Sequence, residues 1–289
     1  MTVSIPEQIS EELSNMRGWM FDVDGCLMRT DRPGGQGGEP MPSAGALIAH
    51  LYETGHQVVV CTNASEQTPE YYAEHMRSVG VPVRDEDFMT AGSAAADYIA
   101  HHYPRGSILA LGSDGLVGPL RDRGAHVASP KETSVDAVVI GDAQMYSYEM
   151  INAACAAVEA GAALYTTVLK PWFYGGLGKA VAISALITTA VGWATSGQEP
   201  QVLGKPSPAL AKNIQTRLGM PADQICIVGD APAEVELARH IRAHAALVLS
   251  GSVRPEDLPS LNEPAVPDTV AADVEVLYHH LKSHATTEQ

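Results

Sequence analysis

The chain has 289 residues, with 34 acidic and 18 basic side chains and a formal net charge of −16 at pH 7. Such a charge opposes binding to nucleic acids and to anionic membranes, and no basic patch interrupts it. Hydrophobic residues make up 45% of the chain, which is ample for a packed core, and the length suits one large domain or two smaller ones. We therefore expect a globular protein whose partners include neither nucleic acid nor a membrane.

The sequence shows no signal for export or membrane insertion. Residues 1–7 lack a basic region followed by an apolar segment. The longest apolar stretch, at about 180–194, falls short of the ~20 residues that a membrane span needs, so we expect a packed helix there. The four cysteines have no Cys-X-X-Cys spacing and are too few for a disulfide scaffold, which makes a reducing, cytoplasmic location the simplest expectation.

The first motif follows a short apolar run. Residues 5–18 predict an amphipathic lead-in helix, and residues 19–21 predict a buried strand that ends at the Asp-Val-Asp-Gly sequence of residues 22–25. Ligands of open α/β sheets collect outside the carboxyl ends of strands, and Gly25 permits a turn that lets both acids face one site. The same residue types are common in plain turns, so the rest of the chain must decide between a turn and a site. A loop rich in Gly and Pro, at 32–42, follows directly and could fold over the acids.

The remaining segments alternate between helices and strands. Helices are predicted at 44–54, 70–79, 94–102, 114–123, 148–160, 208–218 and 233–240. Strands are predicted at 58–61, 108–111, 135–140, 163–167, 225–228 and 246–249. The alternation restarts at about residue 106, and a run of about 100 residues with its own alternation can enclose its own core. We therefore predict a parallel α/β sheet with a second, smaller α/β unit inserted into it, followed by a polar, mobile tail after residue 281.

Polar side chains gather where the predicted strands end or a helix opens. These side chains are Asp22 with Asp24, Thr62 with Asn63, Lys205, and Asp230. Each group alone has an ordinary explanation, such as a helix cap or a solvated surface charge. Four such groups at the ends of successive elements favour one shared site instead.

In this order the four groups resemble the motifs of the haloacid dehalogenase superfamily of phosphotransferases. The matching segments are Asp-X-Asp-Gly at 22–25, Thr-Asn at 62–63, Gly-Lys-Pro at 204–206 and Val-Gly-Asp at 228–230. Segments 39–42, 203–208 and 250–258 are similar to the NagD-like branch, which includes pyridoxal phosphate, phosphoglycolate and nucleotide phosphatases. The resemblance extends from about residue 17 to 281. It implies an α/β fold in which a Rossmann-like parallel-sheet core, residues 1–90 and 199–289, carries an inserted α/β cap domain at 91–198.

The resemblance also implies a phosphatase that acts on a small phosphorylated metabolite. Asp22 would be the nucleophile that forms an aspartyl-phosphate, and Asp24 the acid that protonates the leaving group and then activates water. Thr62 and Lys205 would hold the phosphoryl oxygens, with Asn63 supporting them. Transfer of the phosphoryl group to an acceptor other than water is equally compatible with the motifs. Caps in this branch often mediate homodimers, so a homodimer through the cap is a further expectation.

Magnesium is the cofactor that the resemblance implies. Mg²⁺ would bind Asp22, the backbone carbonyl of Asp24, and Asp230, which are hard oxygen ligands suited to it. One departure concerns this site, because the branch usually has Thr-Asp where this chain has Glu234 and Val235. We expect Glu234 to replace the second acid from one helical turn away and to orient a metal-bound water. Alternatively the metal site is weakened, and the protein binds phosphorylated ligands or acts as a scaffold with little turnover.

The predicted cap contains a second departure. Where many relatives read Thr-Asn-Pro-Asp after the cap strand, residues 166–174 of this chain carry a lysine among aromatic side chains. Lys170, Trp172 and Tyr174 are therefore candidate substrate contacts, since rings beside a lysine can stack on a ring-bearing or apolar substrate. Simple packing within the cap explains the same cluster.

Overall fold

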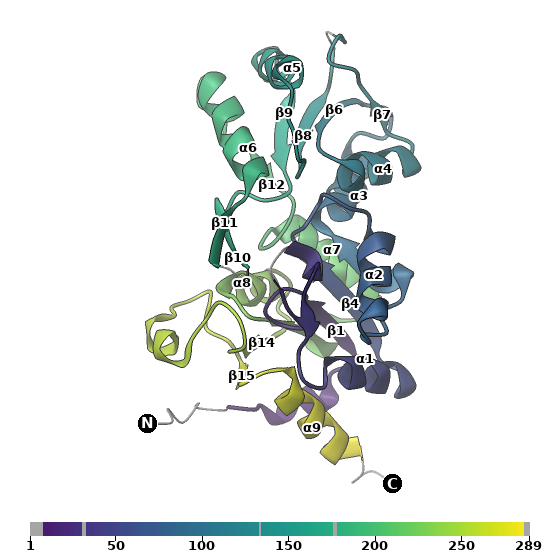
Figure 1. The fold of residues 1–289 in the computed structure, drawn as a ribbon, viewed down its shortest axis with the longest axis vertical. Coiled ribbons are helices and arrows are strands. Elements are labelled where there is room, and N and C mark those ends of the chain that lie inside the picture. The colour runs from purple at the N-terminus through teal and green to yellow at the C-terminus, as the bar shows by residue number, and fades with distance from the viewer. Residues whose placement is uncertain (1–7, 31–32, 133, 176–177, 286–289) are drawn as a thin grey trace.

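Two parallel sheets organise the structure, a computed structural model that describes residues 8–30, 33–132, 134–175 and 178–285. A six-stranded sheet occupies the lower half of Figure 1 and a five-stranded sheet the upper half. Helices cover both faces of each sheet. The predicted α/β fold with a parallel-sheet core is confirmed.

The core sheet brings three strand ends to one edge. Its order is β15 (Thr269–Ala271), β14 (His244–Val248), β13 (Ile225–Gly229), β1 (Gly18–Asp22), β4 (Gln57–Thr62) and β5 (Phe88–Thr90), with every neighbouring pair parallel. In this register Asp22 lies opposite Cys61, and Phe21 lies opposite Val228. The motifs that follow β1, β4 and β13 therefore meet at the same edge, as expected for parallel strands.

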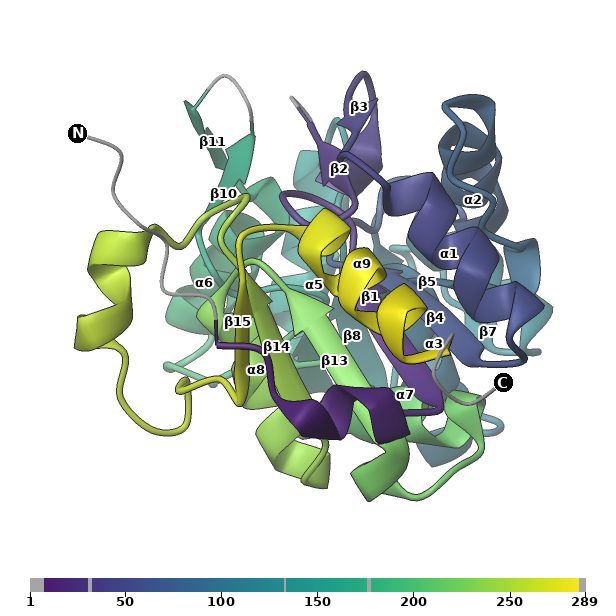
Figure 2. The ribbon, with the colours of Figure 1, turned by 90° about the horizontal axis from the view of Figure 1, so that it is seen from below.

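Alternation along the strands divides the core into two apolar layers. Met20, Val59 and Ile227 pack under α7 (Pro208–Leu218) and α8 (Pro232–Ile241). The residues between them on the strands point to the other face, because successive strand side chains point to opposite faces. That face is covered by α1 (Ala44–Glu53), α2 (Pro69–Ser78) and α9 (Val274–Ala285), with α1 and α9 side by side in Figure 2.

The cap has its own sheet and its own two apolar layers. The strand order is β12 (Gln201–Val202), β9 (Ala163–Thr166), β8 (Ala137–Ile140), β6 (Ser107–Leu111) and β7 (His126–Val127). One face is covered by α3 (Ala91–His102) and α4 (Asp114–Asp122), the other by α5 (Tyr148–Glu159) and α6 (Ile183–Ala194). β12 pairs with β9, so residues 201–202 join the cap sheet although the predicted cap ends at 198. A two-residue edge strand has no periodic pattern that would show this in the sequence.

Two antiparallel hairpins complete the fold, and the sequence patterns predict neither of them. One joins β2 (Met28–Arg29) to β3 (Glu39–Pro40), and the other joins β10 (Trp172–Gly175) to β11 (Gly178–Val181). The second hairpin projects from the cap towards α8 of the core (Figure 1). Both lie in Gly-rich segments whose short strands leave too few residues for a pattern of alternation.

The structure differs from the local predictions at the two ends of the described chain. The lead-in helix expected over 5–18 is a single 3₁₀ turn at Glu11–Asn15 within the described residues. The tail expected to be mobile after residue 281 continues α9 to Ala285. Further 3₁₀ turns lie at Pro33–Gly35, Asp85–Asp87, Ala222–Gln224 and Pro255–Ser260.

The apolar stretch near residues 180–194 forms α6, which packs on the cap sheet as predicted. Across the described parts of the chain, every helix is too short or too polar to cross a bilayer. All four cysteines, at 26, 61, 155 and 226, are free thiols.

Candidate active site

A cavity of about 480 Å³ lies between the carboxyl edge of the core sheet and the cap. It is lined by the predicted core residues Asp22, Asp24, Thr62, Asn63, Lys205, Asp230 and Glu234. From the cap, the candidate contacts Lys170 and Trp172 also line it. Tyr174 belongs to β10, but its side chain lies outside the described part of the structure. The fold thus gathers the four sequence motifs around one cavity.

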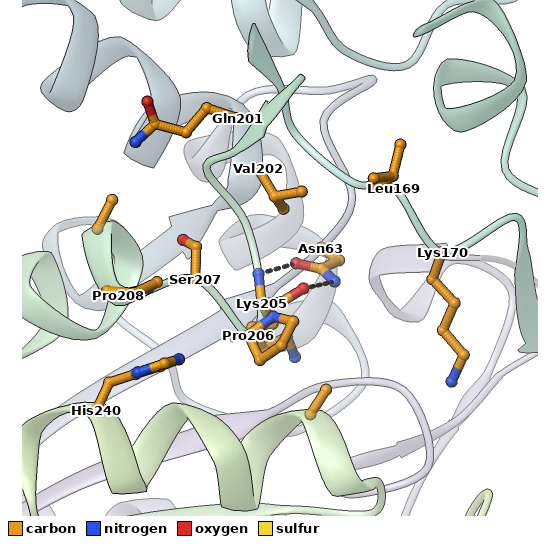
Figure 3. Close-up of a pocket in the computed structure, with 12 residues that line it drawn as sticks. Asn63, Leu169, Lys170, Gln201, Val202, Lys205, Pro206, Ser207, Pro208 and His240 are labelled. Atoms are coloured by element: carbon orange, nitrogen blue, oxygen red, sulfur yellow. Dashed lines mark hydrogen bonds between the residues drawn. The ribbon is translucent and has the colours of Figure 1, made fainter. Parts of the chain in front are cut away.

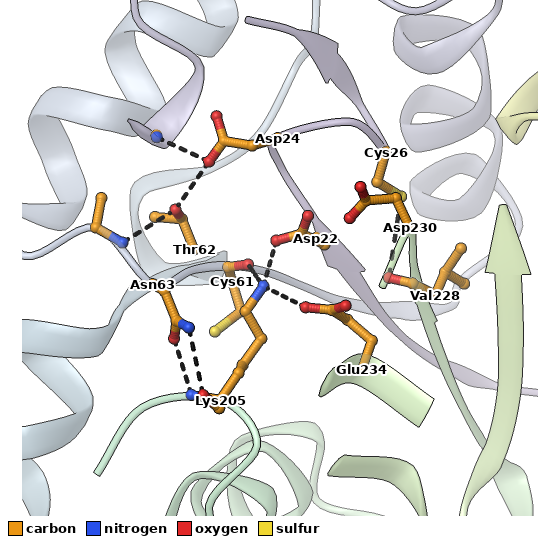
Figure 4. A network of polar contacts seen from close by, with 12 residues as sticks. Asp22, Asp24, Cys26, Cys61, Thr62, Asn63, Lys205, Val228, Asp230 and Glu234 are labelled. Atoms are coloured by element: carbon orange, nitrogen blue, oxygen red, sulfur yellow. Dashed lines mark hydrogen bonds and ion pairs between the residues drawn. The ribbon is translucent and has the colours of Figure 1, made fainter. Parts of the chain in front are cut away.

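Lys205 stands at the centre of the site and contacts two carboxylates. Its Nζ donates to Asp22 Oδ1, lies 2.9 Å from Glu234 Oε1 and donates to the backbone carbonyl of Cys61 at 3.3 Å (Figure 4). Asp22, Lys205 and Glu234 are each about 5% exposed or less. Water therefore screens this ion-pair network only weakly.

The site holds more carboxylates than cations, and the pKa values of its groups reflect this. Burial raises the pKa of Asp22 well above its usual range; Lys205 opposes the shift, whereas Glu234 and Asp230 add to it. Burial alone would lower the pKa of Lys205, but Asp22 and Glu234 together hold it well above its usual value. Lys205 is therefore a permanent cation, and the excess negative charge is free to interact with a further cation.

Asp24 is held by the segment that follows it. Its carboxylate accepts hydrogen bonds from Thr30 Oγ1 at 2.8 Å and from the backbone amides of Gly34 and Gly35 at 2.9 and 3.0 Å. The Thr62 hydroxyl contacts the same carboxylate at 3.4 Å. The Gly- and Pro-rich loop thus folds over Asp24. Gly25 adopts a φ of +86°, and this turn allows Asp22 and Asp24 to line the same cavity.

Asn63 fixes the backbone of Lys205 rather than its ammonium group. The Asn63 Oδ1 accepts from the Lys205 amide at 2.8 Å, and its Nδ2 donates to the Lys205 carbonyl at 3.3 Å. Figure 3 shows this pair of bonds beside a second cavity of about 490 Å³, which also contacts Lys170 and His240. The side chain that follows β4 therefore ties the Thr-Asn motif to the Gly-Lys-Pro segment before α7.

Two glycines make room for the carboxylate of Asp230. A Cβ placed on Gly25 would lie 2.6 Å from Asp230 Oδ2, and one on Gly251 would lie 2.0 Å from the same atom. Asp230 Oδ2 also accepts from the Ser252 amide at 2.6 Å. Burial raises the pKa of Asp230 to about 6, with the charge of Glu234 adding to the effect. The carboxylate is positioned by tight contacts but lacks a cationic partner of its own among the described residues.

The two residues that depart from the branch pattern, Glu234 and Val235, lie in different environments. Val235 is fully buried in the apolar layer beneath α8, so its position does not face the cavity. Glu234 does face it and passes close over Gly229, where a Cβ would lie 2.1 Å from Glu234 Cγ. The second oxygen of Glu234, Oε2, is buried and has no hydrogen-bond partner in the described structure. The acid that differs from the branch pattern is therefore still part of the site, and its pairing with Lys205 is not evident from the sequence.

The donor set fits a small divalent cation. Asp22 and Asp230 line the cavity with carboxylate groups, and the buried Glu234 Oε2 has no hydrogen-bond partner among the described residues, so a cation or a further donor could satisfy it. Among the residues described, His, Cys, Asp and Glu form no group of three or more suited to holding a metal. Mg²⁺ needs no such group, because it usually takes one or two carboxylates and completes its shell with water and phosphate oxygens.

Several cavity residues are missing from the predicted set. Glu66 and Asp142 line the cavity, and Gln144 joins them from the cap. Glu66 lies just beyond the Thr-Asn motif, and Asp142 just beyond the end of β8. The rule that places ligands at the carboxyl ends of parallel strands, applied to the cap as well as the core, would have identified Asp142.

Comparisons with known proteins agree with the geometry. A family model described as haloacid dehalogenase-like hydrolase matches residues 19–126, and one described as HAD-hydrolase-like matches residues 202–277. An acid sugar phosphatase of Staphylococcus aureus is 28% identical over 221 residues, which are 75% of this chain and 80% of that protein.

Solved structures share both the core and the cap. A 4-nitrophenylphosphatase from Thermotoga maritima superposes with a TM-score of 0.83 and 25% identity, covering 94% of this chain and 100% of its own. NagD from E. coli K-12 superposes with a TM-score of 0.78 and 23% identity, covering 90% and 97%. The two family matches between them contain all four motifs that line the cavity. The chain therefore belongs to the haloacid dehalogenase-like hydrolases and has the core-and-cap fold of their NagD-like branch.

Proposed function

We propose that this chain is a Mg²⁺-dependent phosphatase that hydrolyses a small phosphomonoester through an aspartyl-phosphate on Asp22. The contact between Lys205 and Asp22 in the cavity between the core and the cap carries the proposal. It places a carboxylate nucleophile beside a permanent cation, which is what attack on an anionic phosphate requires. The acid sugar phosphatase and 4-nitrophenylphosphatase relatives support the same class of reaction.

In the first step, an Asp22 oxygen attacks phosphorus and the bond from phosphorus to the leaving oxygen breaks. Asp24, in its acid form, gives its proton to that oxygen. Lys205 and the Thr62 hydroxyl face the same cavity and would hold the phosphoryl oxygens. In the second step, water attacks phosphorus, Asp24 takes a proton from the water, and the bond to Asp22 breaks to restore the carboxylate.

Asp24 is suited to this double role by its hydrogen bonds. The amides of Gly34 and Gly35 and the Thr30 hydroxyl fix the orientation of the carboxyl group towards the cavity. The donors come from the loop at the cavity rim, so movement of this loop would change the orientation of Asp24.

Mg²⁺ would be held by Asp22, the Asp24 backbone carbonyl and Asp230. When bound, it would neutralise phosphate charge and so lower the repulsion between the substrate and Asp22. Two unit charges 4 Å apart at an effective dielectric constant near 20 interact with about 4 kcal/mol, so this neutralisation is a large effect. Glu234, already paired with Lys205, would orient water beside the ion.

Magnesium is expected to raise the thermal unfolding midpoint of the protein. At a concentration about 100-fold above its dissociation constant, the ion would stabilise the fold by about 2.7 kcal/mol, or roughly 5–10 °C for a chain of this size. Differential scanning calorimetry in matched ionic strength measures the shift. Asp230→Asn should lose most of it, Glu234→Gln should retain most of it, and Asp114→Asn, an exposed change on α4, should behave as the unaltered chain. An equal shift in Asp230→Asn would argue against this ligand.

Without metal, stability is expected to fall as the pH rises through 6. The pKa of Asp230 is raised to about 6 from a usual 3.8, so its protonated form favours the folded state. This contribution is complete below about pH 4 and is lost as the pH passes 6, with a limit of about 3 kcal/mol for a shift of two pKa units. Denaturant unfolding in EDTA at several pH values measures the slope. Asp230→Asn should flatten it, whereas an unchanged slope would contradict the assignment to Asp230.

Two rival interpretations lead to different measurements. Phosphoryl transfer to another acceptor predicts phosphorylated products when alcohols are added. A binding protein without turnover predicts tight binding of an ester and no phosphate release in the presence of Mg²⁺. The second interpretation rests on the altered segment after Asp230. Glu234 in that segment nevertheless forms an ion pair with Lys205, so the site retains an acid at this position.

Dimerisation through the cap remains a prediction. On α6, Leu186 and Trp193 are 49% and 84% exposed, which makes this helix the surface to test. A change in sedimentation coefficient for Trp193→Ser would support a contact there.

A further inference from the structure

The cavity extends well beyond the groups that act on phosphorus. At about 480 Å³ it holds far more than a phosphate, and much of its wall comes from residues with no part in the proposed reaction. We propose that this outer wall selects a phosphomonoester whose leaving group is rich in hydroxyl groups and carries no negative charge of its own, as a sugar or polyol does, and that Glu66 enforces the choice. This inference rests on the proposed phosphatase function and names its substrate class.

The charges of the outer wall oppose a second anion on the substrate. Glu66 and Asp142 both line the cavity, against a single cation there, Lys170, among the described lining residues outside the Lys205 network. A carboxylate or a second phosphate on the leaving group would approach these two acids in a partly enclosed space. Glu66 is half-buried and its bond to Gln144 is exposed, so water screens its charge in part, but two acids against one cation still repel a second anion and would disfavour such substrates.

Glu66 is joined to the cap by one solvent-exposed hydrogen bond. Its Oε1 accepts a hydrogen bond at 3.0 Å from the Nε2 of Gln144, which comes from the loop after β8. A carboxylate offers about four acceptor positions, and this bond uses one of them. Glu66 can therefore accept hydrogen bonds from substrate hydroxyl groups while it joins core and cap across the cavity.

Asp142, in contrast to Glu66, uses both carboxylate oxygens in hydrogen bonds within the protein. Its two oxygens accept from Ser65 at 3.0 Å and from Ser184 at 2.6 Å, and its amide donates to Ser65 at 2.8 Å. Ser65 is fully buried in the core loop that follows the Thr-Asn motif, and Ser184 lies in the first turn of α6. Asp142 thus secures the wall that presents Glu66 and Gln144, and it adds negative charge to that wall.

The remaining wall suits a hydroxylated carbon skeleton. Gln36, Gln67 and Gln144 each bring an amide, which can both donate to and accept from a hydroxyl group. Phe173 and Trp172 bring ring surface from β10, against which the C–H faces of a sugar can pack. Amides and a carboxylate on one part of the wall and aromatic rings on another together match a molecule with both polar and apolar faces.

Matched pairs of substrates test the inference. Sorbitol 6-phosphate against 6-phosphogluconate, and glycerol 3-phosphate against 3-phosphoglycerate, place a neutral hydroxymethyl group where the partner carries a carboxylate. The ratio of kcat/KM within each pair is expected to favour the neutral member by at least about 30-fold. Glu66→Gln keeps the size of the side chain and removes its charge, and it should reduce this ratio by about fivefold to tenfold. Glu74→Gln, the same change at an exposed position of α2, should leave the ratio within about twofold.

The outcomes separate this inference from the proposed function. Release of phosphate from p-nitrophenyl phosphate without a preference within either pair overturns the substrate class but leaves the phosphatase intact. A preference that Glu66→Gln does not change overturns the role of Glu66. Absence of phosphate release from every ester in the presence of Mg²⁺ overturns both. The thermal midpoint of each variant shows whether it is folded, and Glu66→Ser provides a second removal of the charge.

Discussion

Asp22→Asn is expected to slow phosphate release from p-nitrophenyl phosphate by at least about 10³-fold, because an amide oxygen is a far weaker nucleophile towards phosphorus than a carboxylate. The change keeps the shape of the side chain at the end of β1. Asp22 shares Lys205 with Glu234, and burial raises its pKa well above the usual range, so removal of its charge relieves repulsion from Glu234 and Asp230. The variant should therefore remain folded.

Steady-state phosphate release and the thermal midpoint are both needed for this test. A folded variant with less than a tenth of the original rate would already indicate an essential carboxylate, but the nucleophile assignment requires the larger loss. Acid quench of the unaltered protein during turnover should trap a phosphorylated chain, and Asp22→Asn should trap none. A phosphorylated Asp22→Asn variant would move the nucleophile to another residue.

Lys205→Met is expected to lose both activity and stability. The variant would leave Asp22 and Glu234 buried without a cation, and breaking a buried ion pair in this way typically costs about 3–5 kcal/mol. Phosphate release should fall by about 10²–10³-fold, since the cation that faces the phosphoryl group is gone. Lys212→Met, an exposed change on α7, should alter neither measurement appreciably.

A second substitution distinguishes the two effects of Lys205. Glu234→Gln in the Lys205→Met background removes one of the two uncompensated charges, so it should recover part of the lost stability and none of the lost activity. Urea unfolding at pH 7 with and without the second change measures the coupling between the residues. If the two substitutions are additive in stability, the pairing of Lys205 with Glu234 has no energetic consequence and the structural basis for retaining Glu234 falls away.

The helix from 208 to 218 illustrates what could be predicted locally. Both ends agree with α7, because Ser207 accepts from the Leu210 amide, Pro208 occupies the first turn, and Gly219 adopts the left-handed conformation that ends the helix. These signals lie within a few residues of the structure that they determine. The same is true of the apolar runs that became β1, β4 and β13, which are buried along their length except for the first residue of β4.

The short strands and the outer wall of the cavity could not be predicted in this way. β12 has two residues and is defined by its pairing with β9, a partner from another part of the chain. Glu66 and Gln144 are 78 positions apart, and Ser65 and Asp142 are 77 apart. No local pattern distinguishes such residues from other polar side chains in loops.

The sequence by itself determined that the Asp-Val-Asp-Gly segment at 22–25 ends a buried strand and that Thr62, Lys205 and Asp230 occupy matching positions elsewhere in the chain. Parallel strands bring such ends to one edge, so local order sufficed to predict a shared site. Only the tertiary structure decided that Glu234, not position 235, faces that site and pairs with Lys205, and that Glu66 is held across the cavity by the cap. The physical reason is that strand and helix formation depends on neighbours in the chain, whereas ion pairs, burial and the charge of a cavity wall depend on neighbours in space.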